Sequence, residues 1–81
     1  MTTRPRRPSY HQLAARESEH ARAELARAEN ARTFALRQSD AGLREHFLRV
    51  ASRRELDSDY HAQRAQRFEA LAAKEHPIAT R

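Results

Sequence analysis

The stretch Ser39-Asp40-Ala41-Gly42 separates two long runs of helical composition and contains the only glycine of the 81-residue chain. Neither proline nor glycine occurs from residue 9 to 38 or from 43 to 76. Such runs favour helix, because glycine and proline are the residues that weaken a helix most. We therefore predict an all-α fold, an antiparallel two-helix hairpin with helices over about 9–38 and 41–75 that bends at this stretch.

Capping residues support these boundaries. Ser9 is followed three residues later by Gln12, the spacing of a capping box at a helix N-terminus. Asp40 or Ser39 is placed to cap the second helix. His76-Pro77 ends that helix, because proline disfavours helical geometry in the residue before it.

A short basic segment precedes the first helix. Its arginines, Arg4, Arg6 and Arg7, alternate with two prolines, and both proline and repulsion between like charges disfavour an early helix start. We predict a disordered basic arm over 1–8, a helical hairpin domain over 9–76 and a disordered tail over 77–81.

Small and apolar residues recur along one side of each predicted helix. In the first helix this side carries Tyr10, Leu13, Ala14, Ala21, Leu25, Ala28, Ala31, Ala35 and Leu36. In the second it carries Leu43, Phe47, Val50, Ala51, Ala65, Phe68 and Ala72. Alanines seven residues apart let a neighbouring helix approach closely. These residues therefore predict a tightly packed seam between the helices.

An antiparallel hairpin with its bend near residue 40 fixes which residues lie at the same height. It places Phe34 level with Phe47, Leu13 with Phe68, and Tyr10 with Leu71. Near mid-hairpin it gathers a polar layer composed of Glu17, His20, Glu24, Arg54, Asp57, His61 and Arg64. The predicted seam is thus apolar at both ends and polar in the centre.

The polar layer has two interpretations. Glu17 and His20 show the Glu-x-x-His spacing of helix-bundle metal sites, and Asp57 and His61 would add two further ligands. Arg54 and Arg64 at the same level oppose a cation and can pair with the carboxylates instead. We predict an ion-paired layer that holds the helices in register, without a metal or cofactor.

Asp and Ser residues around Leu56-Asp57-Ser58-Asp59 raise an alternative to the hairpin. Both residue types compete for backbone hydrogen bonds, and Ser58 could cap a new helix. A break near 57–58 would fold the chain into a three-helix bundle. Because no glycine or proline occurs there, we favour one continuous helix.

Five large side chains fall outside the predicted seam: Phe34, Leu48, Leu56, Tyr60 and Leu71. Exposed apolar side chains that form one patch are typical of interaction sites. We therefore predict a partner. The simplest is a second copy, which would give a homodimer arranged as a four-helix bundle; a different protein or a nucleoprotein is the alternative.

The residue pattern indicates a binding role. The sequence has no glycine-rich phosphate loop and no cysteine, and we predict a protein that is not an enzyme but a small adaptor, inhibitor or accessory subunit. A net charge of +5 supports nucleic-acid binding through Arg4, Arg6, Arg7 and helix arginines as the alternative. Helix arginines that are spread around both helices argue for the protein partner. Without a long apolar run, we expect a soluble, cytoplasmic protein and no membrane association.

Overall fold

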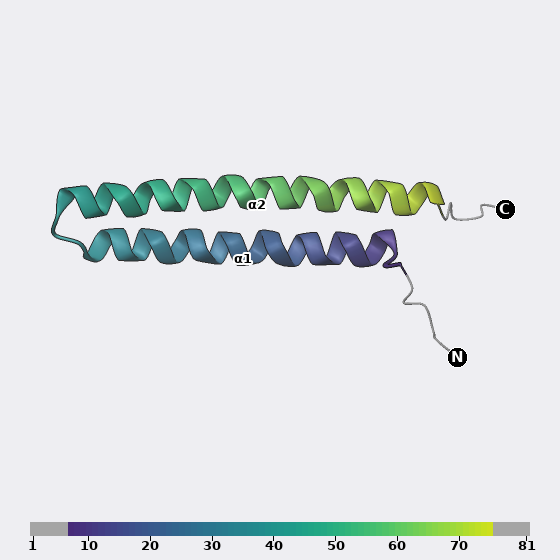
Figure 1. Cartoon of the computed structure of the whole chain (residues 1–81), viewed down its shortest axis with the longest axis horizontal. Coiled ribbons are helices and arrows are strands. Elements are labelled where there is room, and N and C mark those ends of the chain that lie inside the picture. Colours follow the sequence, from purple (N-terminus) through teal and green to yellow (C-terminus); the bar gives the residue numbers. More distant parts are fainter. Residues whose placement is uncertain (1–6, 76–81) are drawn as a thin grey trace, which may run out of the picture.

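Two long antiparallel helices lie side by side and form the hairpin (Figure 1). The computed structural model describes residues 7–75, with α1 over Tyr10–Arg37 and α2 over Ala41–Glu75. The helix ends agree with the predicted ranges to within one residue. α2 is continuous, so the three-helix alternative with a break near 57–58 is wrong. Ser58 does not cap a new helix, because its hydroxyl donates a hydrogen bond of 2.8 Å to the backbone oxygen of Ala21 in α1.

The predicted capping box is present at the start of α1. The Gln12 backbone N–H donates to Ser9 Oγ at 3.1 Å, and the Ser9 N–H donates to Gln12 Oε1 at 2.8 Å. Asp40 caps α2, since its Oδ1 accepts from the Leu43 N–H at 2.9 Å. These side chains satisfy backbone donors that have no partner within the helix, which explains why the helices begin there.

The bend between the helices is short. Only residues 38–40 are non-helical, and Ala41 and Gly42 form the first turn of α2. No residue in the range 7–75 has a positive φ, so Gly42 is not required for a left-handed turn. A Cβ atom at Gly42 would instead lie 3.1 Å from Asp40 Oδ1. The glycine therefore leaves room for the carboxylate that caps α2.

Small residues form one of the two columns of the helix–helix seam. In α1 the buried members are Ala14, Ala21, Ala28 and Ala35, and in α2 they are Ala51, Ser58, Ala65 and Ala72. Each set repeats every seven residues, which keeps it on the side that faces the other helix. No large side chain within 7–75 is fully buried. The core is therefore made mainly of backbone and small side chains in close approach.

The second column of the seam contains larger side chains, and its pairs define the register. Tyr10 stacks on Phe68 with ring centroids 6.2 Å apart, and Glu17 and Glu24 reach across to α2. The predicted pairing of Phe34 with Phe47 is present, at a centroid separation of 5.7 Å. Tyr10 stacks on Phe68, whereas the prediction placed Tyr10 level with Leu71. The contacts of Glu17 with His61 and of Glu24 with Arg54 show the same offset of three residues.

Three leucines lie outside the seam, against the prediction. Leu25, Leu36 and Leu43 are 44%, 85% and 48% exposed. A seam built on alanine brings the two backbones too close together to accommodate a leucine side chain at the edge of the predicted arc. Their apolar surface is therefore presented to the outside of the hairpin.

The ends of the chain are described only in part. Residues 1–6 of the predicted basic arm, and the predicted tail over 77–81, lie outside the described residues. Arg7 and Pro8 are exposed and precede α1. Within the described range, neither helix is long and apolar enough to cross a membrane.

Candidate interaction surface

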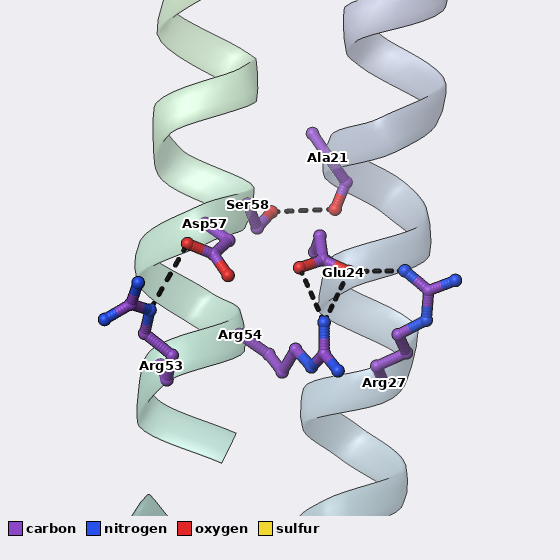
Figure 2. A network of polar contacts seen from close by, with 7 residues as sticks. All are labelled: Ala21, Glu24, Arg27, Arg53, Arg54, Asp57 and Ser58. Atoms are coloured by element: carbon purple, nitrogen blue, oxygen red, sulfur yellow. Dashed lines mark hydrogen bonds and ion pairs between the residues drawn. The ribbon is translucent and has the colours of Figure 1, made fainter. Parts of the chain in front are cut away.

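Glu24 is the centre of a polar cluster at mid-hairpin (Figure 2). Among the residues that the structure describes, Glu24 is the one buried charged residue, with 7% of it exposed. Arg54 of α2 donates to it from Nη1 at 3.2 and 3.3 Å, and Arg27 of α1 donates to Oε1. These contacts hold the pKa of Glu24 below its ordinary value, Arg27 contributing most and Arg54 next, although desolvation acts in the opposite direction.

Glu17 occupies the same column two turns closer to the N-terminus and is held in the same way. Its Oε2 lies 2.9 Å from His61 Nδ1 and accepts from Arg64 Nε at 3.2 Å. The hydrogen bond with His61 is the largest cause of a lowered Glu17 pKa. Desolvation by burial, the next largest effect, raises this pKa, and the charges of His61 and Arg64 lower it further. The carboxylates of Glu17 and Glu24 thus each have two partners.

The predicted polar layer divides into these two clusters, and not all of its members join them. The His20 ring lies 5.1 Å from that of His61 and extends the Glu17 cluster. Asp57 lies beside the seam and pairs with Arg53 of its own helix at 3.6 Å (Figure 2). In the described part of the chain, no group of three or more His, Asp or Glu side chains is arranged to hold a metal ion. The contacts are those of an ion-paired layer.

All five aromatic side chains of the protein lie on one broad side of the hairpin, which we call the aromatic face. They are Tyr10, Phe34, Phe47, Tyr60 and Phe68. Two pairs are stacked across the seam, Tyr10 on Phe68 and Phe34 on Phe47. The Arg64 guanidinium lies over the rings of both Tyr60 and Phe68, at 5.7 and 5.5 Å from their centroids. Most of the ring faces therefore already contact a neighbouring side chain.

Apolar residues on the aromatic face form two patches at its ends. The bend patch consists of Phe34, Leu43, Phe47 and Val50, and the open-end patch of Tyr10, Leu13, Phe68 and Leu71. A shallow cavity of about 210 Å³ beside Phe34 and Phe47 marks the bend patch. Between the two patches lie the clusters of Glu17 and Glu24. The face is thus apolar, charged and apolar along its length.

Basic residues also gather on the aromatic face. Helical periodicity places eight basic residues on the same side as the aromatic rings. They are Arg16, Arg27, Arg37, Arg53, Arg54, Arg64, Arg67 and Lys74. The acidic residues on this side are Glu17, Glu24, Asp57 and Glu75. Among residues 7–75, no ion pair is formed by Arg16, Arg37, Arg67 or Lys74. Arginines occur around both helices, as the sequence indicated, but more of them lie on the aromatic face than on the opposite side.

The opposite broad side, which we call the acidic face, has the reverse charge balance. Its cross-helix pairs are His11 with Glu69 at 3.7 Å, and Arg32 with Glu55. Helical spacing places Glu29, Glu45 and Asp59 on the same side, and the only arginines there are Arg22 and Arg32 within the described residues. The hairpin thus has one basic and one acidic broad side.

The five predicted interaction residues are all exposed but do not share a surface. The exposed fractions of Phe34, Leu48, Leu56, Tyr60 and Leu71 lie between 40% and 66%. Phe34, Tyr60 and Leu71 belong to the aromatic face. Leu48 lies seven residues before Glu55 and belongs to the acidic face, and Leu56 is on the outer edge of α2. The prediction correctly assigned these residues to the surface, but it did not say which of them lie on the aromatic face and which on the acidic face.

Several charged contacts were missed at the sequence level, and two of them show why. Arg27 follows Glu24 by three residues, and that spacing is a usable signal for a pair on one helix. The pair between Arg32 and Glu55 joins different helices, and only the correct register would have revealed it.

No protein-family model, curated protein or solved structure matches this chain in the comparisons with known proteins.

Proposed function

We propose that this protein is a non-catalytic interaction module that binds another macromolecule through its aromatic face. The observation that carries the proposal is sidedness: the aromatic side chains and the arginines without an ion-pair partner lie on the same side of the hairpin. Aromatic residues and arginine are enriched at protein interfaces, where they contribute much of the binding energy. The acidic face has no comparable group.

The exposed apolar side chains support a partner. Phe34, Tyr60 and Leu71 on the aromatic face are 51%, 55% and 40% exposed. Exposed apolar side chains that gather on one surface are typical of interaction sites.

The two seam carboxylates, Glu17 and Glu24, support a structural role for the polar layer. A general base needs a pKa near the working pH and a free lone pair for the proton it accepts. Glu17 and Glu24 have lowered pKa values and are each held by two cationic or imidazole groups. Their geometry suits the fixing of helix register better than proton transfer.

A second copy of the chain, which would form the predicted homodimer, is another candidate partner. The positive charge of the aromatic face opposes pairing of two such faces. A two-fold symmetric pair of aromatic faces would bring the unpaired arginines of both copies together, and like charges at an interface cost binding energy. The homodimer and its four-helix bundle stay a prediction, which light scattering over a range of concentrations would test.

Nucleic acid is the second candidate partner, because the basic residues gather on one face. Arg7 and the unpaired helix arginines could contact phosphates, and such binding would weaken steeply with salt. Arg4 and Arg6 of the predicted arm lie outside the described residues. A mobility-shift assay with duplex and single-stranded DNA and RNA at low salt would retire this candidate if no shift occurs.

A pull-down from the source organism, read by mass spectrometry with and without nuclease, tests the proposed function. The test variant replaces Phe34 and Leu71 by Glu, one in each patch of the aromatic face. The matched control replaces Leu25 and Leu48 by Glu on the acidic face, where the exposed fractions of 44% and 46% are similar.

We expect the wild type and the control to retain the same protein partner in the presence of nuclease, and the test variant to lose it. Circular dichroism should show that both variants keep the helix content of the wild type. Equal retention by both variants, or loss of all partners on nuclease treatment, would contradict binding of a protein through the aromatic face.

A further inference from the structure

We infer that the partner on the aromatic face is an acidic amphipathic helix of another protein, which lies along the hairpin and completes a three-helix bundle. This inference rests on the proposed function and specifies its partner. It follows from the length of the face, the order of its apolar and charged parts, and the sign of its unpaired charges.

The two apolar patches define the length of the occupant. Tyr10 in the open-end patch and Ala31 beside the bend patch are separated by three heptads of α1, about 31 Å at 1.5 Å per residue. Between them, Glu17 and Glu24 already have cationic partners from the hairpin itself. A matching helix is about 25 to 30 residues long, with apolar side chains near both ends of one stripe and small or polar ones between.

The flanks of the face define the charge of the occupant. Arg16 and Arg37 follow the outer side of α1, and Arg67 and Lys74 the outer side of α2, all without an ion pair in the described residues. A helix bound between the basic residues of α1 and those of α2 would contact them through the residues on either side of its apolar stripe. Acidic residues at those positions complete ion pairs on both flanks.

Two other occupants fit less well. Single-stranded nucleic acids bind by stacking bases on open aromatic rings, whereas here Tyr10 and Phe68 stack on each other, as do Phe34 and Phe47. A phosphate chain along the centre would also pass the carboxylates of Glu17 and Glu24. A second copy would meet the first with arginines of the same sign, or through its acidic face in an arrangement that does not close.

The test is a selection with 30-residue peptides that tile the proteome of the source organism. The full-length protein serves as bait in three forms: wild type, Arg16→Glu with Arg67→Glu, and a control of Arg22→Glu with Arg49→Glu. The control makes the same change of net charge away from the aromatic face. Peptides that the wild type enriches are then synthesised and titrated against all three.

We expect the enriched peptides to carry two apolar clusters about three heptads apart, bordered by Asp and Glu, and to gain helix on binding. Their affinity should fall at least about tenfold for the Arg16→Glu, Arg67→Glu variant and stay within about threefold for the control. Melting curves confirm that all three baits are folded.

Each contrary outcome overturns the inference in a distinct way. Enriched peptides that lack acidic residues beside their apolar stripe, or that bind both variants with equal affinity, would contradict an acidic helix as the partner. The pull-down could still support a protein partner in that case. If no peptide is enriched and an oligonucleotide binds, the occupant is nucleic acid. If no peptide is enriched and the molecular mass of the protein in solution grows with its concentration, the occupant is a second copy. Failure of the proposed function is seen separately, as equal retention of partners in the pull-down.

Discussion

Glu17 and Glu24 occupy seam positions at which a helix pair usually has apolar side chains. Each sits seven residues from the other and reaches a cation on α2, Arg64 and Arg54 respectively. A buried ion pair contributes little net stability compared with apolar residues, but removal of one member is costly because the other charge stays buried. These groups therefore favour one register over others that would strand a carboxylate.

The lowered pKa values predict how stability depends on pH. Both groups have folded-state pKa values below the ordinary value of 4.5. The unfolded chain thus binds protons at a higher pH than the folded chain, and this contribution to stability is complete above about 4.5 and is lost as the pH falls through the folded-state values. We expect the Tm to hold above about pH 5 and to fall below 4.5.

The double variant Glu17→Gln, Glu24→Gln is the control for that pH dependence. Glutamine keeps the shape but cannot titrate, so the variant should have a lower Tm near neutral pH and a shallower decline in acid. An acid decline as steep as that of the wild type would contradict the assignment of the pH dependence to these two carboxylates.

The neighbouring residues Arg53 and Arg54 allow a matched test of the Glu24 cluster. Arg54→Met removes a partner of a buried carboxylate, whereas Arg53→Met removes an exposed contact with Asp57 at 3.6 Å. We expect Arg54→Met to lower the Tm by about 5 °C and Arg53→Met to change it by about 2 °C or less. Thermal melts followed by circular dichroism give both values. Equal Tm shifts would show that the ion pair of Arg54 with Glu24 contributes no more to stability than the exposed contact of Arg53.

At the scale of the helices, the column of small residues sets the distance between α1 and α2. Ala28 is 0% exposed and packs with Ala31 and Ala51, while Ala26 on the same helix is exposed. Ala28→Leu has no room in this column and should cost about 1 to 3 kcal/mol in the free energy of unfolding, whereas Ala26→Leu should stay within about 0.5 kcal/mol. Urea unfolding measures both; equal costs would mean that the helices do not pack through the alanines.

The helix boundaries were predictable because local chemistry determines them. Ser9 with Gln12 and Asp40 cap the two helices with their own side chains, and the proline-free runs between them need no tertiary information. The register was only approximate, since periodicity shows which side of a helix is buried but not which turns meet. The prediction for Leu25 was wrong for a related reason. Its hydrophobicity favoured a place in the seam, but the close approach of the alanine columns leaves no room there for a leucine side chain.

The polar layer was partly predictable for the same reasons. Helical spacing and the hairpin register gathered Glu17, Glu24 and His61 near mid-hairpin, and the structure places all three in the seam. Asp57 was assigned to the layer as a residue beside the seam, and in the structure its carboxylate pairs with Arg53 of its own helix. The division of the surface into a basic and an acidic side required both the register and the direction of every side chain, so it emerged only from the folded hairpin.

At the scale of the whole molecule, the hairpin is a thin layer with two unlike sides and a core of small residues. A helix that covers the aromatic face would add large apolar side chains to that core and neutralise the unpaired arginines. The partner would thus supply stability that the isolated hairpin lacks, since binding to the folded state alone shifts the folding equilibrium. The free protein should accordingly melt at a lower temperature than its complex.

Sidedness of binding is tested most directly by photo-crosslinking in cells of the source organism. A photoreactive phenylalanine analogue is placed at Phe34 on the aromatic face in one protein and at Leu48 on the acidic face in another. The two native side chains are 51% and 46% exposed, so random collisions should label both equally. We expect a discrete crosslinked protein product from position 34 and none from position 48; a product from position 48 alone, or equal products from both, would contradict binding through the aromatic face.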